Sequence, residues 1–261
     1  MMKRALIAFM VAAGLCAPAM ANDFSDAQIE EIKYIIGQYF DEHPEKVNDA
    51  LTKYQELQEK KRQEEAAKNV KKYNYELKRD KKTPVIGNKD GDFVIVEFFD
   101  YNCGFCKRMF PQVLDFVEKD GKARWVMKEL PSLGDTSTKM AKFALAANNQ
   151  GKYREVHIAL MSLEDGFDDD KMAEIIKANG MNADKIKADM ESPEIQKLLD
   201  DNRTLANNLG MSGVPMFVIE DELQFGAFDG TNELPKKAEA ARAAKAEAKA
   251  KSKKAKSKAG K

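Results

Sequence analysis

The fold is decided by residues 93–106, which read FVIVEFFDYNCGFC. The first seven residues form an apolar run of strand length that is interrupted only by Glu97. The run leads to a CGFC motif at 103–106, behind which apolar residues recur at helical spacing to about residue 119. A buried strand followed by a helix places Cys103 at a helix N-terminus. There the helix dipole and free N–H groups favour the thiolate, the reactive form of cysteine.

The N-terminus reads as an export signal. Residues 1–21 combine a charged start, an apolar stretch and an A-x-A site, the pattern of a secretory signal peptide cleaved after Ala21. Cys16, the third cysteine of the chain, lies within this segment. The exported protein would therefore keep two cysteines, Cys103 and Cys106, in an oxidising compartment where a dithiol and a disulfide can interconvert.

Charge is distributed unevenly along the chain. The whole sequence carries 43 basic and 43 acidic residues, but residues 236–261 hold 11 basic and 2 acidic ones, so an acidic body precedes a basic tail. The tail is almost entirely Lys, Ala and Glu and lacks the apolar residues that a core needs. We expect residues 236–261 to be a largely disordered, solvated segment that can be helical where it follows Leu234 but is disordered beyond about Lys249. Attraction to an anionic surface is an unspecific alternative.

Residues 22–82 are expected to form an N-terminal helical stalk. Ser25 and Gln28 fit a capping box, and Pro44 is suited to the first turn of a second helix that extends to about residue 79. Apolar residues follow coiled-coil spacing at Ile29, Ile32, Ile36 and Tyr39. Residues 58–72 are nearly all charged, Gln or Ala. The segment is either a helix folded back on the body or a stalk that forms a homo-oligomer through residues 22–60.

The order of strand and helix patterns in residues 83–235 predicts an α/β domain. Strand patterns at 93–99 and 124–130 flank the cysteine helix, a long helical stretch covers about 136–209, and strand patterns return at 216–219 and 223–227. Breaks in the helical stretch are expected at Gly151, Gly166, Gly180 and Pro193. Structural zinc is disfavoured because it needs four ligands, and two cysteines are accompanied only by two distant histidines.

A second motif makes the chain resemble a known family of proteins. Val214-Pro215 stands directly before a strand, about 110 residues after the cysteines. Together with Glu97 six positions before Cys103, the cysteine motif and the helical stretch, it makes the chain resemble DsbA-family periplasmic thiol–disulfide oxidoreductases. The closest resemblance is to ScsC-like and isomerase-type members with an N-terminal oligomerisation stalk. The resemblance implies a thioredoxin fold with an inserted helical domain, and a periplasmic location.

The resemblance also implies roles for residues of the motif. Cys103 is expected to be the attacking or attacked sulfur, and Cys106 the resolving thiol. Gly104 and Phe105 are expected to tune the redox potential. This pair is closer to the Gly-Tyr of DsbC-type isomerases than to the Pro-His of the archetypal DsbA oxidase.

The loop and the strands would supply supporting groups. Pro215, if cis, is expected to lie against the disulfide and leave the Val214 backbone free to pair with an extended client strand. Glu97 is expected to point inward and accept the proton of Cys106, and Lys128 is a candidate partner for Glu97. The alternatives are a solvent-facing Glu97 and an exposed Lys128 at a strand end.

Three kinds of function are consistent with these features. The leading hypothesis is a protein disulfide isomerase acting on unfolded or misoxidised exported proteins, with a disulfide oxidase as the alternative. In either case a membrane redox partner, a reductase or an oxidase, is expected, and the Cys103–Cys106 disulfide is the only redox group. A copper-handling protein binding Cu(I) through both thiolates is less favoured. A non-catalytic interaction protein is disfavoured by the intact cysteine pair, and no nucleic-acid partner or resident metal is expected.

Overall fold

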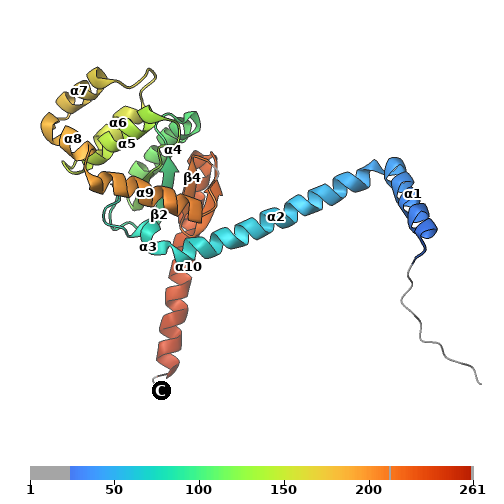
Figure 1. The fold of residues 1–261 in the computed structure, drawn as a ribbon. Helices are drawn as coiled ribbons and strands as arrows, with labels where there is room; N and C mark the ends of the chain where they lie inside the picture. Colours follow the sequence, from blue (N-terminus) through green and yellow to red (C-terminus); the bar gives the residue numbers. More distant parts are fainter. Residues whose placement is uncertain (1–23, 212, 260–261) are drawn as a thin grey trace, which may run out of the picture. The chain divides into compact units, whose positions relative to one another are not determined.

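The computed structural model describes residues 24–211 and 213–259. By its internal contacts the chain divides into two units, residues 1–58 and 59–261. Figure 1 colours the chain from its N-terminus to its C-terminus and labels the helices with strands β2 and β4. The division between the units falls within the long helix α2, Pro44–Lys72. The predicted signal peptide, residues 1–21, lies outside the described residues.

The described part of the first unit contains helix α1, Asp26–Glu42, and the first half of α2. The expected capping box begins α1: the Gln28 N–H donates to Ser25 Oγ, and the Ser25 N–H donates to Gln28 Oε1 at 2.9 Å. None of the residues of α1 is buried. Its apolar side chains are therefore exposed in the single chain, including Ile29, Ile32, Ile36 and Tyr39.

The second half of α2 belongs to the other unit, although its sequence offers little to bury. Ala66 and Val70 are buried, and Val70 packs in the same cluster as Leu77 of the short helix α3, Asn74–Lys78. The region predicted as one stalk, residues 22–82, is thus divided between the two units. Ala66 and Val70 lie one turn apart and form the small apolar face through which this half of α2 packs. The highly charged composition of residues 58–72 did not indicate such a face.

The second unit is built on a five-stranded sheet with the order β1-β3-β2-β4-β5. Strands β2, Phe93–Phe99, and β3, Ala123–Glu129, pair in parallel at its centre. The other strands pair antiparallel to their neighbours: β1 is Val85–Gly87, β4 is Met216–Ile219 and β5 is Glu222–Phe225. Helix α4, Gly104–Asp120, connects β2 to β3 and carries both cysteines at its start.

Side chains that alternate along β2 and β3 fill two separate cores. Phe93, Ile95 and Phe99 pack with α4 and with the helices between β3 and β4. Val96 and Phe98 point to the opposite face, where residues of α2, α3 and α9 cover them. Because both of its faces are buried, β2 reads as an apolar run that only Glu97 interrupts. Any polar side chain within such a run is forced into a core.

The predicted helical insertion consists of five helices that lie between β3 and β4. They are α5, Asp135–Asn148; α6, Tyr153–Met161; α7, Asp169–Ala178; α8, Ala183–Met190; and α9, Pro193–Asn208. The breaks predicted at Gly151, Gly166, Gly180 and Pro193 fall at the junctions between them. Side chains of Asp168, Asn182 and Ser192 cap the last three helices.

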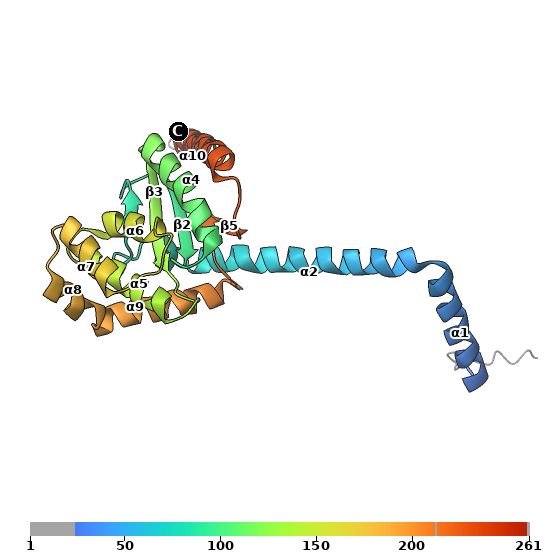
Figure 2. The same cartoon turned by 90° about the horizontal axis from the view of Figure 1, so that it is seen from above.

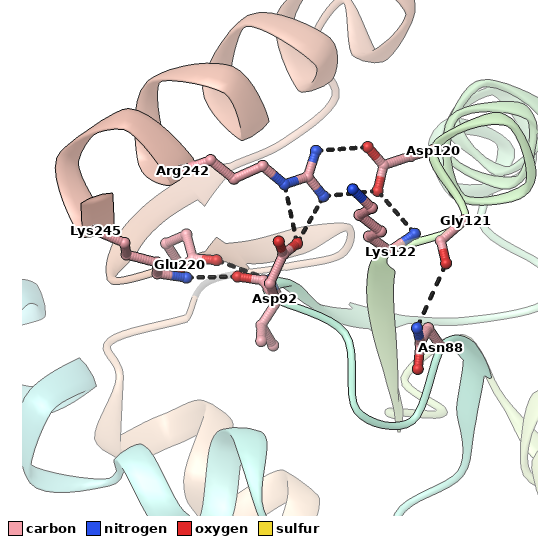
Figure 3. A network of polar contacts seen from close by, with 9 residues as sticks. Asn88, Asp92, Asp120, Gly121, Lys122, Glu220, Arg242 and Lys245 are labelled. Carbon is pink, nitrogen blue, oxygen red and sulfur yellow. Dashed lines mark hydrogen bonds and ion pairs between the residues drawn. The ribbon is translucent and has the colours of Figure 1, made fainter. Parts of the chain in front are cut away.

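Helix α10, Gly230–Ala259, continues past Lys249 and so corrects the expectation that the tail is disordered beyond that residue. Leu234 and Ala238 are buried in the core that contains α4, and Figure 2 shows α10 beside α4. One turn further on, Arg242 binds Asp120 through Nη1 at 2.7 Å and Asp92 through Nη2 at 2.7 Å (Figure 3). Leu234, Ala238 and Arg242 are spaced by four residues and therefore lie on one face of α10. Apolar contacts hold the start of this face against the second unit, and the ion pairs of Arg242 hold its next turn.

We predict that Arg242→Ala destabilises the second unit. The guanidinium makes charge-assisted hydrogen bonds to two carboxylates and holds the pKa of both Asp92 and Asp120 below its ordinary value. Its loss should lower the free energy of unfolding by about 1–2 kcal/mol, measured by urea denaturation. Lys249→Ala, an exposed position on the same helix, is the control. Equal stability of the two variants would contradict the attachment described here.

Candidate active site

The two cysteines lie at the N-terminus of α4. Cys103 is the cap residue, and its Sγ accepts a hydrogen bond from the Cys106 backbone N–H at 3.3 Å. Both are free thiols; Cys103 is 6% exposed, and Cys106 is fully buried one turn deeper. This geometry confirms the expected position of the first sulfur at a helix terminus, where backbone N–H groups and the helix dipole stabilise a thiolate.

The Val214–Pro215 peptide bond is cis, as the resemblance implied. It stands directly before β4 and brings the Val214 carbonyl oxygen to 3.5 Å from Cys103 Sγ, which donates to it. Residues 111 positions apart in the sequence thus meet at the reactive sulfur. Gly104 and Phe105 are exposed beside it, and the Arg108 guanidinium lies 4.3 Å from the centre of the Phe105 ring.

Glu97 points into the core beneath the cysteines. It is 1% exposed, and its Oε2 accepts a hydrogen bond from Trp125 Nε1 at 3.0 Å, while its Oε1 has no hydrogen-bond partner in the part of the chain that the structure describes. Burial raises the pKa of Glu97 to about 8 against the opposing effect of the Trp125 hydrogen bond. Burial likewise raises the pKa of the Cys106 thiol strongly, and the charge of Glu97 raises it further. Both groups therefore keep their protons to a higher pH than the same groups would in water.

Lys128 is not the partner of Glu97, which corrects the expected pairing. In the parallel register Glu97 lies opposite Met127, so Lys128 points to the other face of the sheet. It is buried rather than exposed, and its Nζ donates to Thr83 Oγ1 at 2.7 Å. Burial lowers the pKa of Lys128 to about 8. Its proposed part in tuning the cysteines therefore has no direct contact to support it.

Sequence reasoning missed a second buried carboxyl, Glu129. Its Oε1 accepts hydrogen bonds from the hydroxyls of Tyr101 and Tyr153, each at 2.7 Å. The Tyr101 hydroxyl also lies 3.0 Å from Nδ1 of His157, a residue for which the sequence predicted no catalytic role. The available signal was the strand period: Glu129 follows Trp125 and Met127 at steps of two on a strand buried on both faces.

Asp100 orders the loop between β2 and the cysteines. Its buried carboxylate accepts hydrogen bonds from the N–H groups of Asn102, Ser132 and Leu133, and from the Ser137 hydroxyl, at 2.7–2.9 Å. These donors come from the cysteine loop, the segment after β3 and the start of α5. A single side chain thereby fixes the entry to the cysteine helix against the insertion.

The arrangement fits thiol–disulfide exchange. Such exchange needs a nucleophilic thiol, a second thiol and a proton carrier, and the site holds a sulfur at a helix terminus, a second sulfur behind it and a buried acid. Within residues 24–211 and 213–259, there is no cluster of three or more His, Cys, Asp or Glu side chains suited to a metal. Helices in the same ranges are too short or too polar to cross a membrane.

A family of known proteins matches this chain. The model of the DSBA-like thioredoxin domain matches residues 94–240, which is more than half of the 261 residues. The match begins in β2 and ends in α10, so that it includes both cysteines, the insertion and Pro215. Curated proteins gave no significant match.

Solved structures resemble the chain over most of their own length. A thioredoxin-like oxidoreductase from Silicibacter pomeroyi DSS-3 is 38% identical, with a TM-score of 0.61 over 64% of this chain and 96% of that one. The thiol-disulfide exchange protein α-DsbA2 from Wolbachia pipientis is 29% identical, with a TM-score of 0.62 over 67% and 95%. ScsC from Proteus mirabilis, in a transitional conformation, is 26% identical, with a TM-score of 0.62 over 84% and 99%.

We predict that Glu97→Gln flattens the pH dependence of stability. Glu97 titrates near 4.5 when unfolded and at about 8 when folded, so between these values the folded protein holds a proton that the unfolded chain has released. Stability therefore falls as pH rises through this window, with a slope of up to about 1.4 kcal/mol per pH unit for one group. Removing the carboxyl removes its share of that slope.

The measurement is urea denaturation of the reduced protein between pH 5 and about 7.5. The upper limit keeps clear of Lys128, whose lowered pKa makes stability rise with pH between about 8 and 10.5. Glu164→Gln, at an exposed position, is the matched control and should keep the wild-type slope. If the slope of Glu97→Gln equals that of the control, the burial of a neutral Glu97 is refuted.

Proposed function

Because this chain belongs to the DSBA-like thioredoxin domain family, whose thioredoxin fold and thiol–disulfide oxidoreductase chemistry it shares, we propose that it is a protein disulfide isomerase. The observation that carries the isomerase assignment is the exposed apolar face of α1 and the first half of α2. An oxidase needs only one active site, whereas rearranging a wrong disulfide is helped by several sites held around one client. The Gly104-Phe105 pair favours the same assignment through its similarity to isomerase motifs.

The proposed reaction begins with the Cys103 thiolate. It attacks one sulfur of a wrong client disulfide, forming a mixed disulfide and releasing the other client sulfur as a thiolate. That thiolate then attacks a different client disulfide, and the chain of exchanges ends when a client thiolate displaces Cys103. No net oxidation occurs. If the client stalls, Cys106 attacks Cys103, which leaves a reduced client and an oxidised enzyme.

Glu97 would manage the proton of Cys106. When Cys106 attacks, its thiol must lose a proton, and when the disulfide is opened by an incoming thiolate, the leaving Cys106 thiolate must gain one. Cys106 is fully buried, so water does not reach it directly. Glu97 lies close enough for its charge to raise the pKa of Cys106, and Trp125 orients its carboxyl group.

Clients would bind beside Val214. A cleft of about 500 Å³ lies next to this residue and is lined in part by Leu130, Pro131 and Met211. An extended client strand paired with the Val214 backbone would place its cysteine next to Cys103 and its neighbouring apolar side chains in the cleft. Unfolded or misoxidised exported proteins expose such segments, which folded proteins bury.

The cellular setting follows from the same proposal. The signal-peptide pattern of residues 1–21 predicts export, and the likeness to periplasmic DsbA-family proteins supports a periplasmic location. There a membrane reductase would keep Cys103 reduced, since an isomerase needs a free thiolate, and the Cys103–Cys106 pair would be the only redox group required. A membrane oxidase as the partner would instead make the protein an oxidase.

We predict that the protein reactivates scrambled-disulfide ribonuclease in glutathione buffer through Cys103. Cys103→Ala should reduce the rate at least about 100-fold, because the nucleophile is lost. Cys106→Ala should retain part of the activity and accumulate mixed disulfides, because only escape from stalled clients is lost. If the intact protein merely accelerates oxidation of reduced ribonuclease, the isomerase assignment is wrong and the protein is an oxidase.

We predict that residues 22–60 form a homo-oligomer. Ile32 and Ile36 lie one turn apart on α1 and are 38% and 49% exposed in the single chain, and replacing both by Asp would put charges into the shared interface. Light scattering coupled to size exclusion should show the wild type as an oligomer and the double variant as a monomer. The control is Lys33→Ala with Gln38→Ala on the same helix. A monomeric wild type would refute the oligomer.

A further inference from the structure

We propose that Glu129 is a positioning residue for the thiol chemistry: with Tyr101, Tyr153 and His157, it forms a second buried acid that keeps the proton on Glu97 available to Cys106. This inference rests on the proposed function and adds a group to it. Glu129 does not touch the reacting sulfurs and acts through Glu97. Its position, its hydrogen bonds and its charge carry the inference.

Glu129 and Glu97 share one face of the central strand pair. In the register of β2 and β3, Glu129 lies opposite Phe99 and Glu97 lies opposite Met127, so the two carboxyls are offset by two residues on the same side. Each residue is only 1% exposed, and each carboxyl has one oxygen without a hydrogen-bond partner among the described residues. Two carboxyls in one buried core cannot both ionise cheaply, because each charge opposes the other.

The hydrogen bonds of Glu129 allow two proton arrangements. Tyr101 has a single hydroxyl proton but two neighbours, Glu129 Oε1 at 2.7 Å and His157 Nδ1 at 3.0 Å. When Glu129 is ionised, it accepts from both tyrosines, and the His157 Nδ1–H donates to Tyr101. When Glu129 is protonated, it can donate to Tyr101, which then donates to His157 Nδ1. Each arrangement pairs the Tyr101 hydroxyl fully, so the cluster can hold or release one proton without moving its heavy atoms.

His157 remains neutral in both arrangements. It is fully buried, and burial lowers its pKa to about 3. Its ring is surrounded by aromatic rings whose centres lie 5.0–5.9 Å away, namely those of Phe99, Tyr101, Phe110, Trp125 and Tyr153. The histidine therefore orients Tyr101 by switching tautomer and does not carry the charge itself. The exchangeable proton belongs to the two carboxyls.

Hydrogen bonding makes Glu129 the better site for the first negative charge. Its carboxylate accepts two tyrosine O–H groups, whereas that of Glu97 accepts one Trp125 N–H. The pKa of each is raised to about 8, mainly by burial, and the charge on Glu129 is one of the effects that raise the pKa of Glu97. Once Glu129 is ionised, Glu97 keeps its proton to higher pH and remains an acid for the leaving Cys106 thiolate.

Other polar groups near the pair come from each element packed around it. Asp100, after β2, raises the pKa of Glu129 by its charge, and the tyrosines on either side of Glu129 lower it by hydrogen bonding. Asn202 of α9 donates to the Glu129 backbone carbonyl at 3.0 Å and leaves the carboxyl free. Cys106 of α4 faces Glu97, and the charge of Glu97 raises the pKa of its thiol. None of these groups supplies a buried cation to Glu97 or Glu129 among the described contacts.

The test is a carbon-13 NMR titration of the oxidised full-length protein, labelled at the glutamate carboxyl carbon. Oxidation removes the thiol titrations, and Glu97→Gln assigns the Glu97 signal. In Glu129→Gln the amide oxygen still accepts from both tyrosines, but the charge is gone. The midpoint of Glu97 should then fall by about half a pH unit or more, an approximately threefold or larger rise in its acid dissociation constant. An unchanged Glu97 midpoint in folded Glu129→Gln overturns the inference.

Tyr153→Phe decides the question if Glu129→Gln does not fold. It removes one O–H donor, so Glu129 stays neutral to higher pH and the Glu97 midpoint should again fall. Tyr75→Phe, at an exposed tyrosine, is the matched control and should leave the midpoint unchanged. A Glu97 midpoint that is the same in Tyr153→Phe and in the control would overturn the inference.

A kinetic experiment links the titration to the sulfur chemistry. The rate at which dithiothreitol reduces the Cys103–Cys106 disulfide is followed against pH, since this step requires Cys106 to gain a proton. Glu129→Gln should shift the profile to lower pH by the same amount as the Glu97 midpoint. In a Glu97→Gln background it should cause no such shift, and a persistent shift would contradict action through Glu97. Because neither experiment uses a client, failure of the isomerase assay would leave both results valid.

Discussion

Desolvation of polar side chains between two central strands is the constraint on which the active site depends. Strands β2 and β3 are buried on both faces, so every carboxyl that they carry is withdrawn from water. An isolated buried charge costs several kcal/mol, and the group holds its proton instead unless partners compensate. Glu97 and Glu129 are acids of this kind, and the proton-holding capacity of the site originates in their burial rather than in any special residue type.

The reactive sulfur experiences the opposite environment. Cys103 caps α4, and its sulfur accepts the Cys106 N–H, so backbone dipoles favour its negative charge. Cys106 lies one turn deeper, where burial and the charge of Glu97 raise the pKa of its thiol more than a backbone hydrogen bond at Asp100 lowers it. Two thiols of identical chemistry are thereby made unequal by a displacement of one helical turn. The hydrogen bonds of Asp100 fix the loop before Cys103, and the Val214 carbonyl oxygen accepts from Cys103 Sγ, so the two sulfurs keep these different surroundings.

The two ends of the chain use their residues in contrasting ways. At the C-terminal end, Leu234 and Ala238 are buried, and Arg242 pairs with two carboxylates of the same unit. The apolar and charged side chains of this part of α10 therefore find their partners within the chain. In the first unit, α1 leaves its apolar side chains exposed in the single chain. Exposed apolar surface of this extent and spacing is costly in water, and the proposed homo-oligomer would cover it.

Local features of the fold were predictable from the sequence by itself. Strand and helix periods, the capping box at Ser25, the breaks within the insertion and the position of Cys103 depend on residues close together in the chain. The face on which Lys128 lies, the docking of α10 and the Glu129 cluster were not predictable in this way. They depend on the register between β2 and β3 and on contacts between residues 24 to 150 positions apart. The strand period determines that successive side chains point to opposite faces of the sheet. Only packing against other elements decides whether a given side chain meets water, a hydrogen-bond partner or another charge.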